Sequence, residues 1–495
     1  MKRRLRIISL MLIVLFFTGC VREEAVLPSL TLPPIAQGAD APIGDAGLRQ
    51  EHTVTLYLPS RDGQTLVALH ETLMLSRDQH PAETVLRCLL AHGGNGRVQP
   101  LGGEVSLSLS GSNPVELCGE ICTVNLSAGA LQLSGQELYS AALAIAATLC
   151  ELDGISYVTL LVAGNPIAMD VGGNLPLGAL KSEVGQELPV LWEQLTARRT
   201  PVGELASATP LTATAALYFP LADGSGIVAE PRRIAFAGQH PQQQVIALLE
   251  ALSNGADTLT GIANLPDYDD LQLFLPEVTD LESGGKRVTL SLRADAKERI
   301  ASAGCDPACY FAAVTTTLTT FVPSLQQVCV LLGDGALTSL YGNGLGSILF
   351  PGAVQNRPKF SHALQKQTEV CFVGDGKLIA VALSMPYRSA SSPRAVLLRM
   401  AQVGALPNGL TDADILGLAI ESDTLLVHLS RRYGDVIRDS GWDQRLVAYA
   451  MVNTLGEMLH VRRVRFFFGG ETADTLGGSL MWSGEFLVNQ QLVTQ

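Results

Sequence analysis

The feature that most constrains this chain is a series of short motifs that recurs three times in the same order. Each copy has a strand-like opening run, a proline that begins an apolar stretch, a Val-x-Leu-Ser run and a Thr-Leu pair. The Val-x-Leu-Ser runs lie at 124–127, 288–291 and 427–430, and the Thr-Leu pairs at 148–149, 317–318 and 454–455. Landmarks repeated in one order are typical of tandem units. We therefore predict three copies of one unit, which agrees with the number of domains expected for 495 residues.

Each copy is predicted to run strand, turn, strand, helix, hairpin, helix and strand. Asp-Gly pairs suit tight turns, and a proline suits the first position of a helix because its N–H has no partner there. The second helices of copies one and three show capping-box patterns, Ser134-x-x-Glu137 and Ser440-x-x-Asp443. The predicted fold class is α+β, an α/β sandwich in which two helices cover one face of a small mixed sheet. The Asp-Gly pairs lie at 62–63, 223–224 and 375–376, and the prolines are Pro81, Pro241 and Pro393.

Segments rich in Gly, Pro and polar residues separate the copies. We expect a signal peptide at 1–20, a flexible tether at 21–50, repeated domains at 51–180, 211–342 and 366–485, linkers at 181–210 and 343–365, and a tail at 486–495.

The N-terminus resembles a bacterial lipoprotein signal. Four basic residues lie within positions 2–6, the stretch 7–18 is almost wholly apolar, and a Thr-Gly pair precedes Cys20. In such a signal the Cys thiol takes a diacylglyceryl group and becomes the mature N-terminus. An ordinary cleaved signal and an N-terminal anchor are the alternatives, and all three place the mature chain outside the cytoplasm. The lipoprotein interpretation predicts a chain anchored through Cys20 at the extracytoplasmic face of the cell membrane.

Composition excludes several classes of protein. The chain is 47% hydrophobic and 16% charged, which argues against disorder as its main state. Past residue 20 it contains no apolar run of about 18 residues, the length that crosses a bilayer. Its formal net charge of −13 argues against nucleic acid as a partner, because phosphates attract a basic surface.

The repeated unit resembles the GerM domain of sporulation and spore-germination lipoproteins. The resemblance is based on the opening runs Leu56–Pro59 and Leu217–Pro220, the proline-initiated helix, the Val-x-Leu-Ser strand and a closing strand that runs into Gly. The third copy lacks the Tyr-x-Pro signature of the first two. The resemblance implies a fold similar to ring-building motifs of the sporulation machinery and a role in spore assembly or germination. It implies no catalytic residues, and we expect no cofactor.

Few residues suggest chemistry. His80 and His240 each precede a helix-initiating proline, and the third copy has Ser392 in that place, so we interpret them as helix caps and not as acid–base catalysts. Asp412 and Asp414 lack the further oxygen ligands and Gly of a calcium loop, so no metal site is expected.

Eight cysteines remain once Cys20 is assigned to lipid. In an exported chain, the closely spaced pairs Cys118/Cys122 and Cys305/Cys309 could form local disulfides or remain free. Because the two pairs fall at different points of their repeats, a shared zinc site is not expected. The other four cysteines are expected to be buried as small apolar residues.

Arginines concentrate in the third copy of this acidic chain. They are either solvated side chains with ion pairs or a docking patch for an acidic partner, a wall polymer or lipid headgroups. The candidate patch comprises Arg431, Arg432, Arg462, Arg463 and Arg465.

These observations predict a membrane-tethered, non-enzymatic structural or interaction protein of sporulation or germination, with envelope proteins or cell-wall material as partners. The alternative is a peptidoglycan-modifying enzyme or a wall-binding protein of the cell envelope. An enzyme would need an acid and a base, or a metal, at a fixed place, whereas the polar positions of the three copies differ.

Overall fold

The computed structural model describes residues 31–32, 41–169, 174–197, 211–236, 240–282, 284–374, 376–472 and 474–494. The predicted signal peptide with Cys20, most of the predicted tether and Asp375 lie outside the described residues. No helix within the described ranges is long and apolar enough to cross a membrane.

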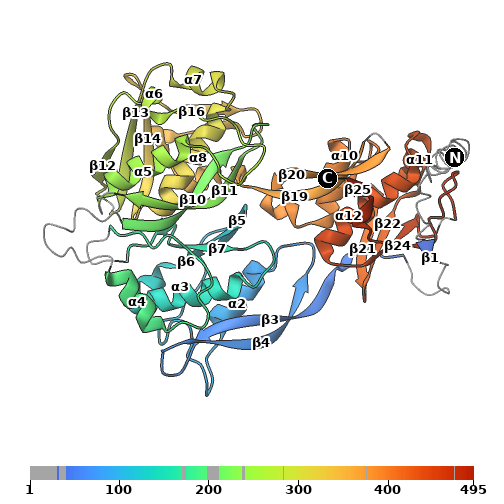
Figure 1. Cartoon of the computed structure of the whole chain (residues 1–495), viewed down its shortest axis with the longest axis horizontal. Coiled ribbons are helices and arrows are strands. Elements are labelled where there is room, and N and C mark those ends of the chain that lie inside the picture. Colours follow the sequence, from blue (N-terminus) through green and yellow to red (C-terminus); the bar gives the residue numbers. More distant parts are fainter. Residues whose placement is uncertain are drawn as a thin grey trace, which may run out of the picture.

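Three units of similar element order make up the chain (Figure 1). Unit 1 covers residues 49–197, unit 2 covers 211–363 and unit 3 covers 365–494. Unit 1 consists of β3 (Arg49–Pro59), β4 (Leu66–Ser76), α2 (Ala82–Ala91), β5 (Val115–Cys118), β6 (Ile121–Leu126), the 3-10 helix η1 (Ala128–Gln132), α3 (Gly135–Leu149), β7 (Tyr157–Val162), β8 (Asn165–Pro166), β9 (Ala179–Leu180) and α4 (Leu188–Ala197).

Units 2 and 3 repeat this order with additions. Unit 2 consists of β10 (Leu211–Pro220), β11 (Ile227–Phe236), α5 (Pro241–Ser253), α6 (Tyr268–Leu271), β12 (Glu277–Asp280), β13 (Lys286–Leu292), α7 (Ala296–Ser302), α8 (Pro307–Phe321), β14 (Leu325–Leu332), β15 (Gly335–Ala336), β16 (Ser339–Gly342), β17 (Gly346–Leu349), η3 (Pro351–Ala353), β18 (Val354–Gln355) and η4 (Arg357–Ala363). Unit 3 consists of β19 (Gln365–Gly374), β20 (Lys377–Pro386), α9 (Tyr387–Ala390), α10 (Pro393–Gln402), η5 (Asp412–Asp414), β21 (Ile415–Glu421), β22 (Thr424–Leu429), α11 (Arg431–Asp439), α12 (Gln444–Leu459), β23 (Arg463–Phe468), β24 (Glu485–Leu487), η6 (Gln490–Leu492) and β25 (Val493–Thr494).

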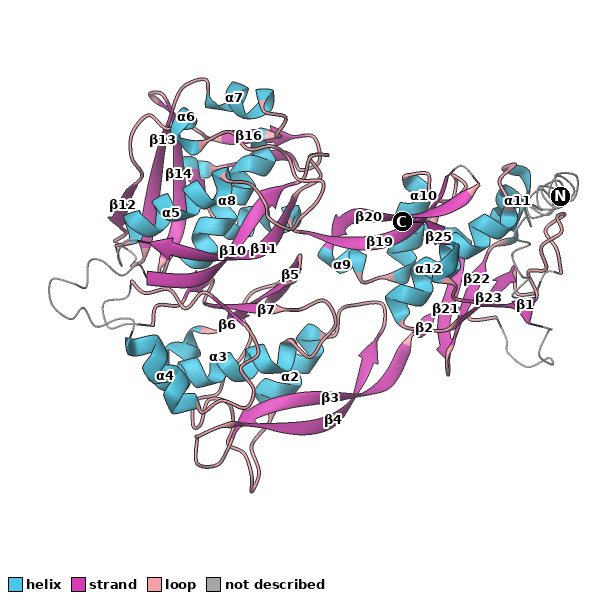
Figure 2. Ribbon diagram, viewed as in Figure 1, coloured by secondary structure: helices cyan, strands magenta, loops and turns pink. Residues whose placement is uncertain are grey.

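The α+β fold class is confirmed, and each unit contains a hairpin sheet and a mixed sheet, to which unit 2 adds a separate two-stranded sheet, β16–β17. The first two strands form an antiparallel hairpin: β3–β4, β10–β11 or β19–β20. The later strands form a mixed sheet around a parallel pair: β6–β7, β13–β14 or β22–β23. The second helix lies between these sheets, as Figure 2 shows for α3 between β3–β4 and β6–β7. In α3, every residue from Ala141 to Leu149 is buried, which is typical of a helix covered on all sides.

The repeated Thr-Leu pair has a structural explanation. Its threonine hydroxyl accepts the backbone N–H of the hairpin strand that lies across the helix. Tyr57 donates to Thr148 Oγ1 at 2.9 Å, Tyr218 to Thr317 Oγ1 at 3.0 Å and Cys371 to Thr454 Oγ1 at 2.9 Å. All three bonds are buried, so each satisfies a donor that would otherwise be unpaired in a core. Cys371 therefore occupies the position of the signature tyrosine in the third copy.

The helix starts agree largely with the sequence. The ring nitrogens of His80 and His240 accept the backbone N–H groups of Ala82 and Gln242. His240 is the cap of α5, as expected, whereas α2 begins one residue later, with Pro81 at the cap position and His80 just before it. Ser392 caps α10 as His240 caps α5.

The two predicted capping boxes differ in outcome. The box at Ser134 and Glu137 is present. The prediction of a box at Ser440 and Asp443 is wrong. An additional helix, α11, occupies the preceding residues, so Ser440 is the C-cap of α11 and Asp443 is itself the N-cap of α12.

The connectors require correction. Strand β2 (Gly44–Gly47) lies within the expected tether but pairs in parallel with β21 of unit 3, and β1 (Thr31–Leu32) pairs with β24. The expected linker at 343–365 contains strands and η4, which pack on unit 2. The expected tail ends in β25, which pairs with β20. These segments lack apolar periodicity because they are short and pair mainly through their backbones.

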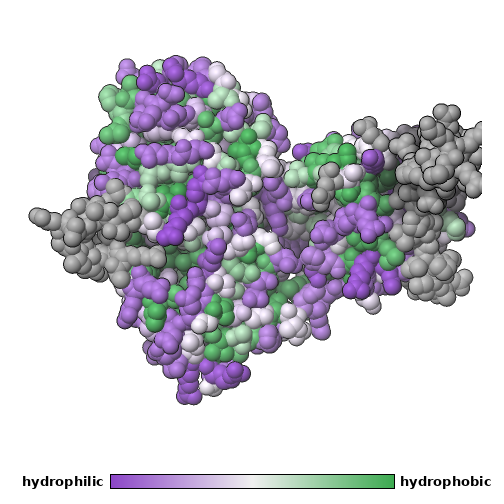
Figure 3. Space-filling model, in the orientation of Figure 1, coloured by the Kyte–Doolittle hydropathy of each residue, from purple (hydrophilic) through white to green (hydrophobic). Residues whose placement is uncertain are grey.

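Units 1 and 2 share one hydrophobic core, which also includes Tyr387 of unit 3, whereas the rest of unit 3 has its own core. At the first junction, the Arg357 side chain from η4 is buried and donates to Glu116 of β5 at 2.6 and 3.1 Å. It also donates to the Tyr218 hydroxyl at 3.2 Å and to the Thr320 hydroxyl. Unit 3 meets the other two through a narrower region, visible as a waist in Figure 3.

Candidate binding cleft between the first and third units

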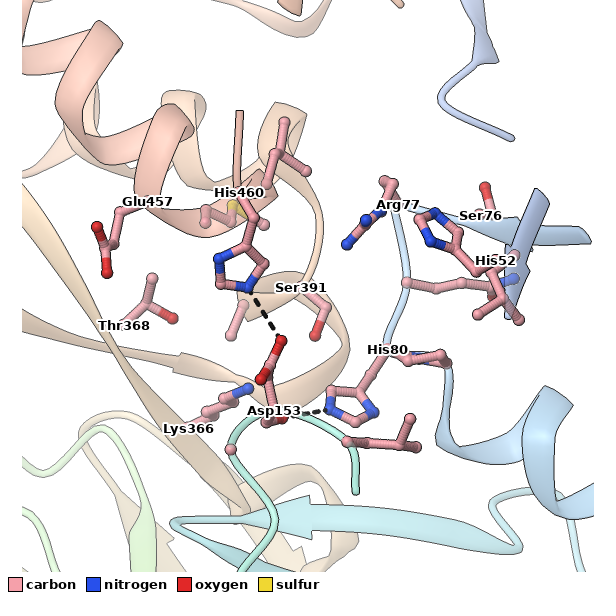
Figure 4. Close-up of a pocket in the computed structure, with 18 of the residues that line it drawn as sticks. His52, Ser76, Arg77, His80, Asp153, Lys366, Thr368, Ser391, Glu457 and His460 are labelled. Carbon is pink, nitrogen blue, oxygen red and sulfur yellow. Dashed lines mark hydrogen bonds and ion pairs between the residues drawn. The ribbon is translucent and has the colours of Figure 1, made fainter. Parts of the chain in front are cut away.

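A cavity of about 480 Å³ lies where unit 1 meets unit 3. Unit 1 contributes the first half of β3, the end of β4, the start of α2 and the turn at 151–154 that follows α3. Unit 3 contributes the start of β19, the end of α9 and the end of α12. Figure 4 shows polar side chains from both units converging on this space, and we call it the 1–3 cleft.

His80 is held in one neutral form at the floor of the cleft. Its Nδ1 accepts the N–H of Ala82 at 3.2 Å, so its Nε2 carries the proton and donates to the backbone oxygen of Asp153 at 3.2 Å. Burial, reinforced by the nearby Lys366 ammonium, lowers the pKa of His80 to about 4. His80 is therefore uncharged at neutral pH. A neutral imidazole can accept the N–H of Ala82 at the start of α2, but it is not suited to act as a proton donor.

A polar contact spans the two units. His460 Nε2 lies 3.1 Å from Asp153 Oδ2, and this contact is an ion pair only when the imidazole is protonated. His460 ends α12 in a left-handed conformation with φ of 52°, which turns its ring toward unit 1. Because the Asp153 side chain is 87% exposed, we expect this contact to contribute little stability.

Two basic side chains, Arg77 and Lys366, face the same space. Arg77 follows β4, and its Nε is buried without a hydrogen-bond partner among the described residues. Burial lowers the pKa of both Arg77 and Lys366, and the negative charge of Asp153 opposes that shift in each case. Burial and the charge of Arg77 also lower the pKa of His52. The cleft thus holds partly desolvated positive charge.

The acidic residues of the cleft are directed elsewhere or lie at its rim. Glu151 accepts a hydrogen bond from the Tyr57 hydroxyl at 3.0 Å. Glu369 and Glu457 are exposed, and Figure 4 shows Glu457 beside Thr368, on the side of His460 away from Arg77. Asp153 is therefore the carboxylate placed between the two cations.

Neither of the two possible disulfides is present in the structure. In the β5–β6 hairpin Cys118 lies opposite Ile121 and Cys122 lies opposite Leu117, so the two cysteine side chains point to opposite faces of the sheet. Cys305 and Cys309 are free, and Cys309 donates to the Gly224 oxygen at 3.3 Å. Burial raises the pKa of Cys118 and Cys305 to about 12, which leaves them poor nucleophiles.

Of the other four cysteines, Cys371 is buried, whereas Cys88, Cys150 and Cys329 are half-buried. The expectation of burial therefore holds fully only for Cys371.

The arginines of the candidate patch have partners within unit 3. Arg431 lies 2.9 Å from Glu471, and Arg462 and Arg463 lie 3.8 Å from Asp423 and Glu485, respectively. Arg432 pairs with Asp414, and the Arg465 guanidinium lies 5.2 Å from the centroid of the Phe467 ring. These contacts support the interpretation as solvated side chains with ion pairs, and docking by the patch stays a prediction.

The 1–3 cleft was not predicted from the sequence. Among its polar residues, the sequence patterns point only to His80, as a helix cap. The charged residues come from separate segments of two units, and no spacing marks them before the chain folds. Within the described residues, no group of three or more His, Cys, Asp and Glu side chains is placed to hold a metal ion.

The fold and the order of landmarks define a protein built from tandem α+β units. Residues 55–168 match the family model Germane, described as sporulation and spore germination. The chain therefore contains a GerM domain, which covers most of unit 1.

Three solved structures are similar to parts of the chain. The tandem GerMN domains of the sporulation protein GerM from Bacillus subtilis are 18% identical, with a TM-score of 0.23, and cover 62% of this chain and 99% of their own. A putative lipoprotein from Clostridium perfringens is 18% identical, with a TM-score of 0.19, and covers 30% and 93%. The first GerMN domain of the B. subtilis protein is 20% identical, with a TM-score of 0.21, and covers 27% and 98%. No curated protein matches the chain.

Proposed function

We propose that this protein is a lipoprotein, tethered to the extracytoplasmic face of the cell membrane, that acts without enzymatic activity as a structural or interaction protein in sporulation or spore germination. The observation that carries the proposal is the match of residues 55–168 to a sporulation and germination family. The repetition of the same element order in units 2 and 3 supports it, because tandem units create extended surfaces for partners.

The attachment of the N-terminal segment to unit 3 supports the tether. The Asp45 carboxylate accepts two hydrogen bonds from Arg394, at 2.7 and 2.8 Å, and one from the backbone N–H of Leu418 at 3.2 Å. Leu48 is fully buried in the core of unit 3. Eleven residues lie between Cys20 and β1 when Thr31 is included, which gives a reach of at most about 40 Å. Unit 3 would therefore lie nearest the membrane.

The shared landmarks support a role without catalysis. The positions that recur in all three units are apolar residues, helix caps and the threonine that satisfies a strand N–H. These positions serve the fold. The histidine at the first two helix starts is replaced by Ser392 in unit 3, so no titratable side chain is common to the three helix starts.

The anchor is tested by replacing Cys20 with Ala in the full chain expressed in a Gram-positive host. We expect the wild-type chain to incorporate labelled fatty acid and sediment with membranes, and the variant to lose the label. A variant that is still labelled would show that the lipid is attached elsewhere.

The biological role is tested by disrupting the gene in the source cells. We expect fewer heat-resistant spores or slower germination, with vegetative growth unchanged. Unaltered spore yield and germination would contradict the proposed role.

The enzymatic alternative is tested with the mature chain lacking lipid (residues 21–495) and purified peptidoglycan. We expect no soluble muropeptides to be released. Release that is lost on heating the protein would favour a peptidoglycan-modifying enzyme.

A further inference from the structure

We infer that the 1–3 cleft binds the carboxylate of an organic anion with a small apolar body. This inference goes beyond the proposed function, because it requires neither lipid at Cys20 nor a role in spores. It is based on the positive charge of Arg77 and Lys366, on the placement of the acidic groups and on the apolar part of the cavity lining.

The positive charge comes from opposite walls of the cleft. Arg77 is contributed by unit 1 and Lys366 by unit 3, and Figure 4 shows both side chains directed into the same space. The Nε of Arg77 is buried without an acceptor in the part of the chain that the structure describes. A buried donor without a partner is costly, so an acceptor supplied by a ligand would stabilise it.

Of the four carboxylates that line the cleft, Asp153 is the one whose charge acts on both Arg77 and Lys366. Asp153 faces both cations and also contacts His460. Glu151 is engaged by Tyr57, and Glu369 and Glu457 are exposed at the rim. His80 is uncharged because its pKa is lowered to about 4. One further negative group between Arg77 and Lys366 would balance the second cation.

A carboxylate fits this arrangement better than a large polyanion. The guanidinium fork of arginine matches the two oxygens of a carboxylate, and one lysine adds a second charge-assisted contact. The remaining lining mixes polar side chains with apolar ones, and its apolar part includes Val54, Leu75, Pro81, Leu152, Ala390 and Met458. A cavity of about 480 Å³ lies within the usual range for small-molecule sites. The ligand would therefore place its carboxylate near Arg77 and its apolar body against these apolar side chains.

Two sources share this chemistry. One is the free C-terminal carboxylate of a peptide or protein, and the other is a small carboxylic acid in solution. The test uses N-acetyl-alanyl-alanine for the first, benzoate for the second, and the amide of the same dipeptide as the control without charge.

The experiment is calorimetric titration of the mature chain lacking lipid (residues 21–495) with these three probes. We expect at least one acid to bind with a Kd below about 10 mM and the amide to bind at least about tenfold more weakly. Stronger binding of the dipeptide acid would favour a peptide C-terminus, and stronger binding of benzoate would favour a small acid. Equal binding of acid and amide, or no binding of either acid at that concentration, would overturn the inference.

Variants locate the site. Arg77→Gln should weaken binding of the acid by about 10- to 100-fold, and Lys366→Gln by a smaller factor. Arg97→Gln is the matched control, because Arg97 lies exposed in the same unit and outside the cleft. Circular dichroism melting of each variant separates loss of binding from loss of folding. Unchanged affinity in a folded Arg77→Gln protein would also overturn the inference.

Discussion

The junction between units 1 and 2 differs from the junction of unit 3 with the other two in the side chains that fill it. The first is part of a continuous hydrophobic core and contains the buried pair of Arg357 and Glu116. The second holds polar contacts, such as that of Arg388 with Asn113 at 2.6 Å, and the solvent-accessible 1–3 cleft.

This difference teaches that copies of one fold can be joined for different purposes. Apolar burial across a junction makes two units depend on each other for stability. At a polar junction each unit keeps a hydrophobic core of its own, as unit 3 does. Such a junction can also contain a cavity for a ligand. We therefore expect units 1 and 2 to unfold together and unit 3 to unfold separately.

The largest effect is expected for Arg357→Ala. The change leaves the Glu116 carboxylate buried without its cation, which costs about 3–5 kcal/mol of unfolding free energy. In guanidinium unfolding, the transition of units 1 and 2 should move to lower concentration while that of unit 3 stays unchanged. Arg388→Ala, at the polar junction, is the control and should cost less than about 1 kcal/mol. Equal losses in the two variants would remove the distinction between the junctions.

The threonine contacts allow the same comparison within each unit. Thr317→Val and Thr454→Val each leave a buried strand N–H without an acceptor, at a cost of about 1–3 kcal/mol. Thr317→Val should lower only the transition of units 1 and 2, and Thr454→Val only that of unit 3. Differential scanning calorimetry distinguishes these outcomes, and a shift of both transitions by either change would contradict separate cores.

The N-terminal attachment should stabilise unit 3 alone. Arg394→Ala removes two hydrogen bonds to Asp45 and should cost unit 3 about 1–2 kcal/mol. Limited proteolysis should then cut near residues 42–48 sooner than in the wild type. Arg399→Ala, on the same helix, is the control. Cleavage at the wild-type rate would show that the strand pairing of β2 suffices.

The smallest effect concerns pH and His80. Its folded-state pKa is lowered to about 4, below the unfolded value near 6.5, so the unfolded chain binds the proton more readily. The associated stability is complete above about pH 6.5 and is lost as the pH falls toward 4, by about 1 kcal/mol after allowance for solvent. His80→Asn keeps a hydrogen-bond acceptor at the start of α2 but removes the titrating ring. The stability of units 1 and 2 should therefore depend less on pH between these two values. An equally steep slope in the variant would assign the effect to another group.

Much of the fold could be predicted from the sequence because it depends on local signals. The prolines begin α5 and α10 as expected and directly precede α2, and alternating apolar residues give the hairpin of β21 and β22. The sandwiched position of the second helix was missed, although the run of buried alanines in α3 has no polar face. A helix without a polar face indicates cover on all sides.

The remaining features depend on contacts between distant residues. Asp45 and Arg394 are 349 positions apart, and the sequence of β2 is too short and too polar to indicate a strand. The charged residues of the 1–3 cleft likewise come together only when unit 3 docks on unit 1. Such sites require the arrangement of whole units, which no local pattern encodes.

The shared core of units 1 and 2 is tested most directly by hydrogen exchange with mass spectrometry on the wild type and Arg357→Ala. We expect exchange in the cores of α3 and α8 to accelerate by the same factor, about 100-fold or more, while α12 exchanges as in the wild type. Acceleration in only one of α3 and α8, or an equal acceleration in α12, would contradict two units with one core and a third that stands apart.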